Sequence, residues 1–190
     1  MSRAIRGSFF MRYQFLIDTY ETEILKVLSV WSSFQDGDLS ARPHPTDKRG
    51  RSVHEQMVHQ CVSENNWFKN MFSIDVGAPP LPSPESRDAF IRRYAEDAMK
   101  RLEQLRIRDN AWWEEEVSFF KVPRSRAWVM VRRIAHTAHH RGQQMTLLRM
   151  LNREVYSNYG PTADTAESVI YAYEDLKALL AAGRKTKLPS

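Results

Sequence analysis

Apolar residues recur at helical spacing along the first part of the chain. The intervals alternate between 3 and 4 residues through Phe10, Tyr13, Ile17, Tyr20, Ile24, Val27, Trp31 and Phe34. This alternation keeps one side of a helix apolar over the whole segment. Such a continuous stripe has to be covered by neighbouring helices at shallow crossing angles, so it predicts a helix within a bundle.

Polar and capping signals mark the next two elements. The segment from Asp36 to Arg51 holds two prolines, two glycines and many charges, a composition that predicts a loop. Ser52 follows, and Glu55 stands three residues later. The two side chains can form a capping box, which predicts a second helix from here to about Phe72.

A proline-rich stretch, GAPPLPSP, separates the second helix from the third. Ser83 and Pro84 are a suitable N-cap and first-turn pair, so they predict the start of the third helix, which should end near Arg108. Its expected buried face comprises Ile91, Tyr94, Ala98, Leu102 and Leu105. Residues 110–126 mix acidic, aromatic and proline positions and predict an irregular connection with at most a brief extended piece.

The remaining pattern predicts two more helices. One starts near Ser125 or Arg126 and runs to about Asn152; the other runs from Thr162 to about Ala182, where Gly183 fits a C-cap. The expected structure is therefore all-α, with no convincing strand. A chain of 190 residues without a low-complexity break fits one domain, residues 1–190.

Composition narrows the function classes. The 28 basic and 23 acidic side chains give a net charge of +5, but they are mostly interleaved, which favours a solvated surface over nucleic-acid binding. Cys61 is the only cysteine, so no intramolecular disulfide can form and a cytoplasmic location is expected. No segment approaches the roughly 20 apolar residues of a membrane span, so no membrane partner is expected.

Three of the six histidines lie together in the segment IAHTAHHRGQQM, Ile134 to Met145. Because a helix advances about 100° per residue, His136 and His140 share one face and can point at one ion. His139 lies about 60° to the other side and is expected to be a neighbour of the site rather than a ligand. Thr137 follows His136, so the general-base glutamate of an H-E-x-x-H metalloprotease is missing.

A third ligand has to come from another helix. On the helical wheel of the second helix, His54 falls on the apolar stripe with Met57 and Phe68, which mildly favours it, whereas His59 falls on the polar face. The residue pattern leaves both open. Gly142, in the other helix, is expected to allow close approach of a neighbouring helix. Neutral imidazole is a suitable ligand for zinc, nickel, iron and copper.

The string H-T-A-H-H-R-G-Q and the later NYGPTAD resemble the DinB-like (DinB/YfiT) family of bacterial metalloproteins. The resemblance implies a four-helix bundle with an additional C-terminal helix, often a homodimer, that binds a divalent metal ion such as zinc or nickel, with iron as a further candidate. In SVHEQMVHQCVSENNWF it places His59 at the ligand position of the second helix. The implied metal ligands are therefore His59, His136 and His140.

The resemblance also implies a set of functions. Some family members are enzymes that act on small molecules with low-molecular-weight thiols, so a metal-dependent thiol S-transferase is the leading expectation. A metal-dependent hydrolase and a non-enzymatic stress-response or metal-responsive module are the alternatives. No motif assigns a catalytic residue: Glu55 and Glu64 carry no base signature, and Cys61 is expected to be a buried side chain rather than a nucleophile.

Overall fold

The computed structural model describes residues 11–47, 49–77 and 81–155. Its long helices are α1 (Gln14–Ser33), α2 (Val53–Phe72), α3 (Arg87–Arg106) and α5 (Arg126–Met150). The shorter elements are the 3-10 helix η1 (Asp36–Asp38), the helix α4 (Asn110–Glu114) and the strands β1 (Glu116–Phe119) and β2 (Val122–Ser125).

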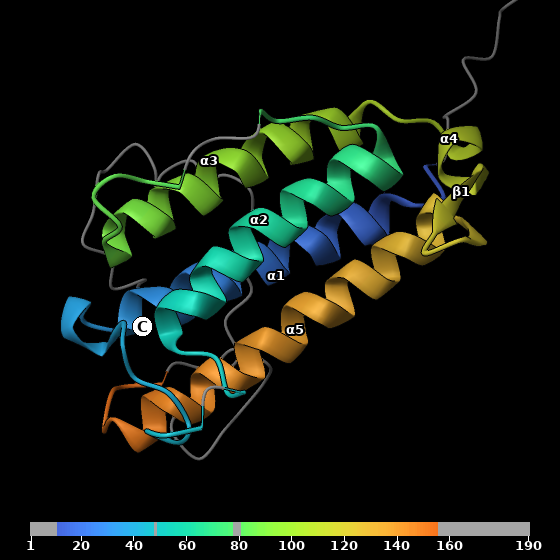
Figure 1. Cartoon of the computed structure of the whole chain (residues 1–190). Helices are drawn as coiled ribbons and strands as arrows, with labels where there is room; N and C mark the ends of the chain where they lie inside the picture. Colours follow the sequence, from blue (N-terminus) through green and yellow to red (C-terminus); the bar gives the residue numbers. More distant parts are fainter. Residues whose placement is uncertain (1–10, 48, 78–80, 156–190) are drawn as a thin grey trace, which may run out of the picture.

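The long helices form a bundle in which α1 and α2 each pack against both α3 and α5. Figure 1 shows α4 and β1 at one end of this bundle, beside the start of α5. The mostly helical architecture predicted from the sequence is confirmed. The expected last helix, Thr162 to Ala182, lies outside the described residues.

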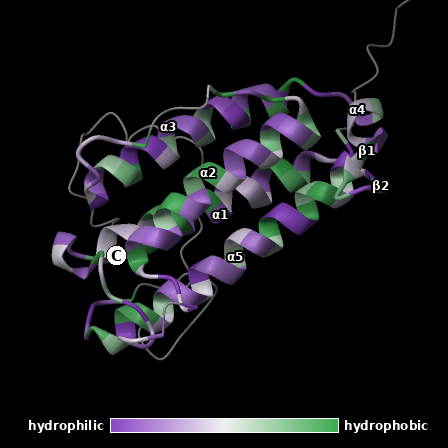
Figure 2. Cartoon of the chain, in the orientation of Figure 1, coloured by the Kyte–Doolittle hydropathy of each residue, from purple (hydrophilic) through white to green (hydrophobic). Residues whose placement is uncertain are grey.

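The apolar stripe of α1 forms part of the core, as predicted. The side chains of Ile17, Tyr20, Ile24, Val27, Trp31 and Phe34 are all completely buried. Figure 2 shows hydrophobic and hydrophilic residues alternating along the long helices, as expected for amphipathic helices in a bundle. None of the described helices combines the length and apolar character that crossing a membrane requires.

Two helices start where the sequence predicts, and a serine side chain caps each of them. The Ser52 hydroxyl accepts a 3.2 Å hydrogen bond from the Glu55 amide, and the Glu55 carboxylate accepts a 2.7 Å bond from the Ser52 amide. The Ser125 hydroxyl accepts a 3.2 Å bond from the Trp128 amide at the start of α5. Both helices begin where these side chains satisfy otherwise unpaired amides.

The predicted start of the third helix is wrong. Ser86, not Ser83, is the N-cap of α3, and its hydroxyl accepts a 3.2 Å hydrogen bond from the Ala89 amide. Tertiary contacts fix this start, because the Arg87 guanidinium donates to the backbone carbonyls of Ser32 and Phe34 at the end of α1.

The connection between α3 and α5 is more regular than predicted. Besides α4, it contains an antiparallel hairpin in which Glu116 pairs with Ser125 and Phe119 with Val122. The turn residues Phe120 and Lys121 have φ values of 48° and 69°. Glycine or asparagine normally occupies such positions, so the sequence carries no hairpin signal here. The brief extended piece that the sequence predicts corresponds to the strands β1 and β2.

Candidate metal centre

His59 of α2 lies opposite His136 and His140 of α5. The ring centroids are 4.7 Å apart for His59 and His140, 5.6 Å for His59 and His136, and 4.5 Å for His136 and His140. One ring nitrogen from each histidine lies within 4.8 Å of the others. The described chain therefore brings together a three-histidine group that is consistent with a divalent metal site.

The spacing within the pair on α5 fits one shared ion. The Nε2 atoms of His136 and His140 are 3.3 Å apart. Tetrahedral zinc with zinc–nitrogen bonds of 2.0–2.1 Å requires ligand nitrogens about 3.3 Å apart. The Nδ1 atoms of both rings are buried and have no hydrogen-bond partner among the described residues.

All three imidazoles are held in the neutral form that metal binding requires. Burial, followed by the charges of Arg51 and Arg133, lowers the pKa of His59. Burial and then the Arg133 charge lower the pKa of His136 to about 4. Burial and the neighbouring His136 lower the pKa of His140 to about 3. At neutral pH the ring lone pairs are therefore available.

His54 lies away from this group. The helical wheel mildly favoured His54 over His59, and this preference is wrong, because His59 is the residue that faces α5. Its Nε2 atom contacts the Glu85 carboxylate, and its ring lies edge-on to Phe90, with centroids 5.6 Å apart. His54 is in the first turn of α2, where the segment before α3 passes. His59 faces α5 because the polar side of α2 lines the space between the two helices.

The other notable residues of the α5 segment have local roles. His139 is exposed, and its Nε2 atom is 3.1 Å from the Gln143 amide nitrogen, as expected for a neighbour of the group. Gly142 is also exposed, and a Cβ atom added there would meet nothing within 4 Å. The predicted close approach of another helix at Gly142 is therefore wrong for the described chain.

An aromatic wall that the sequence did not reveal covers one face of His136. The Trp67 indole stacks on the His136 ring at a centroid distance of 5.8 Å and an interplanar angle of 28°. Phe119 and Phe120 of the hairpin contact the same indole edge-on, at 5.4 and 6.2 Å. Trp67 thus links the hairpin to the site. In the sequence, only its aromatic type and its position two turns after His59 pointed to a role of Trp67 at the site.

A buried carboxylate lies on the core side of the site. Glu64 accepts hydrogen bonds of 2.5 Å from the Tyr20 hydroxyl and 2.8 Å from the Tyr94 hydroxyl. Its carboxylate is also 3.2 Å from Arg101 and 3.5 Å from Arg133. Burial opposes the charge of Glu64, but the two guanidiniums and the hydroxyls hold its pKa below the ordinary value. Glu64 is therefore an ionised carboxylate that already interacts with these four side chains.

Neither of the other candidate groups is placed for chemistry. Glu55 belongs to the capping box of α2 and also pairs with Arg42 at 3.2 Å. Cys61 is buried, and burial raises the pKa of its thiol to about 12. It is thus a core side chain at neutral pH, as expected from its position on the apolar stripe.

Comparison with known proteins shows the family and the fold of the chain. The model of the DinB family matches residues 24–175, so the chain belongs to the DinB family. Its structure is similar to the crystal structure of a DinB-like protein from Bacillus cereus, with a TM-score of 0.61 and 20% sequence identity over 74% of this chain and 92% of that chain. At that identity the likeness concerns the fold. No curated protein matches the chain.

Proposed function

We propose that His59, His136 and His140 hold one divalent metal ion and that the protein is a metal-dependent enzyme acting on small molecules. The observation that carries this proposal is the convergence of the three imidazoles from α2 and α5. Membership of the DinB family supports it. Zinc and nickel are the favoured ions and iron the next, because neutral imidazole is a good ligand for all three.

The histidine group is partly exposed and partly buried. His59 and His136 are half-buried, whereas His140 is buried. A substrate can therefore approach from the side of the first two rings. Trp67 stacks on His136 and offers an apolar surface beside this approach. A divalent ion at the three imidazoles would supply a Lewis acid, which lowers the pKa of a thiol or a water molecule beside it.

Thiol transfer is the reaction that the surroundings favour. In this reaction the thiol loses its proton to solvent, its sulfur bonds to an electrophilic carbon, and the displaced group leaves with its bonding electron pair. The step needs an activated thiol but no separate carboxylate base. The buried carboxylate of Glu64 is already engaged by two tyrosines and two arginines. Hydrolysis, which commonly uses a carboxylate base beside the ion, is the second candidate.

A conjugation screen tests the reaction. The zinc- and nickel-loaded proteins are incubated with small thiols and a panel of alkyl and aryl electrophiles, and thioether formation is followed by mass spectrometry. We expect turnover that disappears after chelation and in His140→Ala, and that persists in His54→Ala. Ester hydrolysis without thioether formation would favour the hydrolase. Stoichiometric metal without any turnover would favour a non-enzymatic metal-responsive module.

A further inference from the structure

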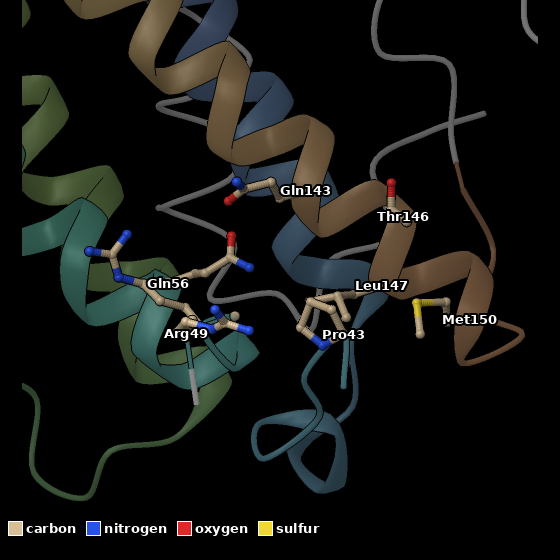
Figure 3. A pocket seen from close by; sticks show the side chains of 9 residues that line it. Pro43, Arg49, Gln56, Gln143, Thr146, Leu147 and Met150 are labelled. Atoms are coloured by element: carbon tan, nitrogen blue, oxygen red, sulfur yellow. The ribbon is translucent and has the colours of Figure 1, made fainter. Parts of the chain in front are cut away.

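A cavity of about 250 Å³ opens between the end of α5 and the loop before α2. Figure 3 shows Gln56 of α2 and Gln143 of α5 on facing sides of it, with Thr146, Leu147 and Met150 further along α5. Pro43, Arg49, Gly50 and Arg51 of the loop complete its lining. A space of this size accommodates a small molecule or one end of a larger one.

Two of the lining residues lie close to the histidines along their helices. Gln56 precedes His59 by three residues on α2, and Gln143 follows His140 by three residues on α5. Three residues correspond to a rise of about 4.5 Å along a helix. The Gln143 amide nitrogen also lies 3.1 Å from the Nε2 atom of His139, the residue next to His140. Gln56 and Gln143 thus lie about one helical turn from His59 and His140.

The lining is positively charged. It includes two arginines and no acidic residue. The Arg49 guanidinium is paired with Asp47 at 2.7 Å, whereas Arg51 is exposed and forms no ion pair within the described part of the chain. The Arg51 charge also reaches the histidines, since it contributes, after burial, to lowering the pKa of His59. An anionic group in the cavity would therefore meet the Arg51 charge directly.

We propose that this cavity binds the anionic end, a carboxylate or phosphate group, of the small molecule whose reactive atom reaches the three histidines. Arg51 supplies the charge for that end. The proposal rests on the proposed function, because it assigns a substrate class to the same site: small anionic molecules, and for thiol transfer, thiols that carry a carboxylate or phosphate.

Binding of simple anions tests the cavity itself. Zinc-loaded protein is titrated calorimetrically with succinate and with inorganic phosphate. We expect Arg51→Gln to weaken binding of the preferred anion by about tenfold, the scale of one charge-assisted hydrogen bond. Arg124→Gln is the matched control, because it removes the same charge at the other end of α5, where Arg124 belongs to β2. Equal affinities in the wild type and Arg51→Gln would overturn the proposal. Tighter binding of succinate would indicate a carboxylate subsite, and tighter binding of inorganic phosphate would indicate a phosphate subsite.

Thiol binding tests the connection to the histidines. In cobalt-loaded protein, a bound thiolate produces a charge-transfer absorption. We expect mercaptosuccinate to bind about tenfold more tightly than 2-mercaptoethanol, and Arg51→Gln but not Arg124→Gln to abolish this preference. An unchanged preference in Arg51→Gln would overturn the proposed substrate class. If the protein binds no cobalt, the proposed function fails, whereas the anion titration of the protein as purified still decides whether the cavity is an anion site.

Discussion

The guanidinium of Arg133 lies 3.5 Å from the carboxylate of Glu64, and both side chains are completely buried. This contact joins α5 to α2 on the core side of the histidine group. Arg133 also donates hydrogen bonds of 3.1 and 3.3 Å to the Thr137 hydroxyl, one turn further along α5. Its guanidinium lies 5.4 Å from the centre of the Trp67 ring. One residue thus connects the buried charges, the aromatic wall and the helix that carries His136 and His140.

Replacing Arg133 with methionine should strongly destabilise the fold. The change removes one of the two cations that face the buried Glu64, and breaking a buried charge pair from one side typically costs about 3–5 kcal/mol. The free energy of unfolding from urea titration measures the loss. Lys69→Met, which breaks the exposed pair between Lys69 and Asp75, is the control and should change little. Equal effects of the two substitutions would contradict the assigned role of Arg133.

The ionisation of Glu64 should make stability depend on acid pH. Its folded-state pKa lies below the ordinary value of 4.5, so below that pH the unfolded chain binds a proton that the folded chain does not. The contribution is therefore complete above pH 4.5 and is lost as the pH falls through the folded pKa. Urea midpoints of the wild type and Glu64→Gln, measured from pH 7 to pH 3, should converge at the acid end. A constant difference would show that Glu64 is not ionised.

Much of the fold could be predicted because its signals are local. The stripe of α1 and the Ser52 capping box depend on residues within a few positions of one another, so they are readable from the sequence. The hairpin could not be predicted, because Phe120 and Lys121 occupy a turn that usually takes glycine or asparagine. Its stability comes from packing, including the contact between Phe119 and Trp67.

The sequence pattern predicted only part of the histidine group. The spacing of His136 and His140 places both on one face of any helix, and the structure keeps them there. The helical wheel of α2 could not identify the third histidine, because a polar helix face can line the space between two helices as readily as it faces solvent. The family resemblance pointed to His59, and the structure places that residue beside the pair.

The turn of the hairpin predicts a stabilising substitution. Lys121 is exposed and has a φ of 69°, a left-handed conformation that costs a side chain about 1 kcal/mol relative to glycine. Lys121→Gly should therefore raise the thermal midpoint slightly. The same substitution at Lys69 lies inside a helix, where glycine is unfavourable, and should lower it. A lower midpoint for Lys121→Gly would contradict the turn geometry.

Trp67 should influence metal affinity without being a ligand. Its stacking holds the ring of His136 in place, and groups that orient ligands typically affect metal affinity by about 10–100-fold. Competition with a chromogenic chelator should show weaker zinc binding in Trp67→Ala, with the stoichiometry at saturating zinc retained. Trp128→Ala is the control, since Trp128 packs on the hairpin through Phe119 and is 42% exposed. Similar affinities for Trp67→Ala and the wild type would contradict this positioning role.

Metal content tests the proposed centre most directly. The wild type, His59→Ala, His136→Ala and His140→Ala are purified without chelators and analysed by inductively coupled plasma mass spectrometry, with circular dichroism as a check on folding. His54→Ala and His139→Ala serve as matched controls. We predict about one divalent ion per chain in the wild type and in both controls, and a large loss in each of the other three variants. Stoichiometric metal in His140→Ala, or loss of metal only in His54→Ala, would contradict the assignment of His59, His136 and His140 as the metal ligands.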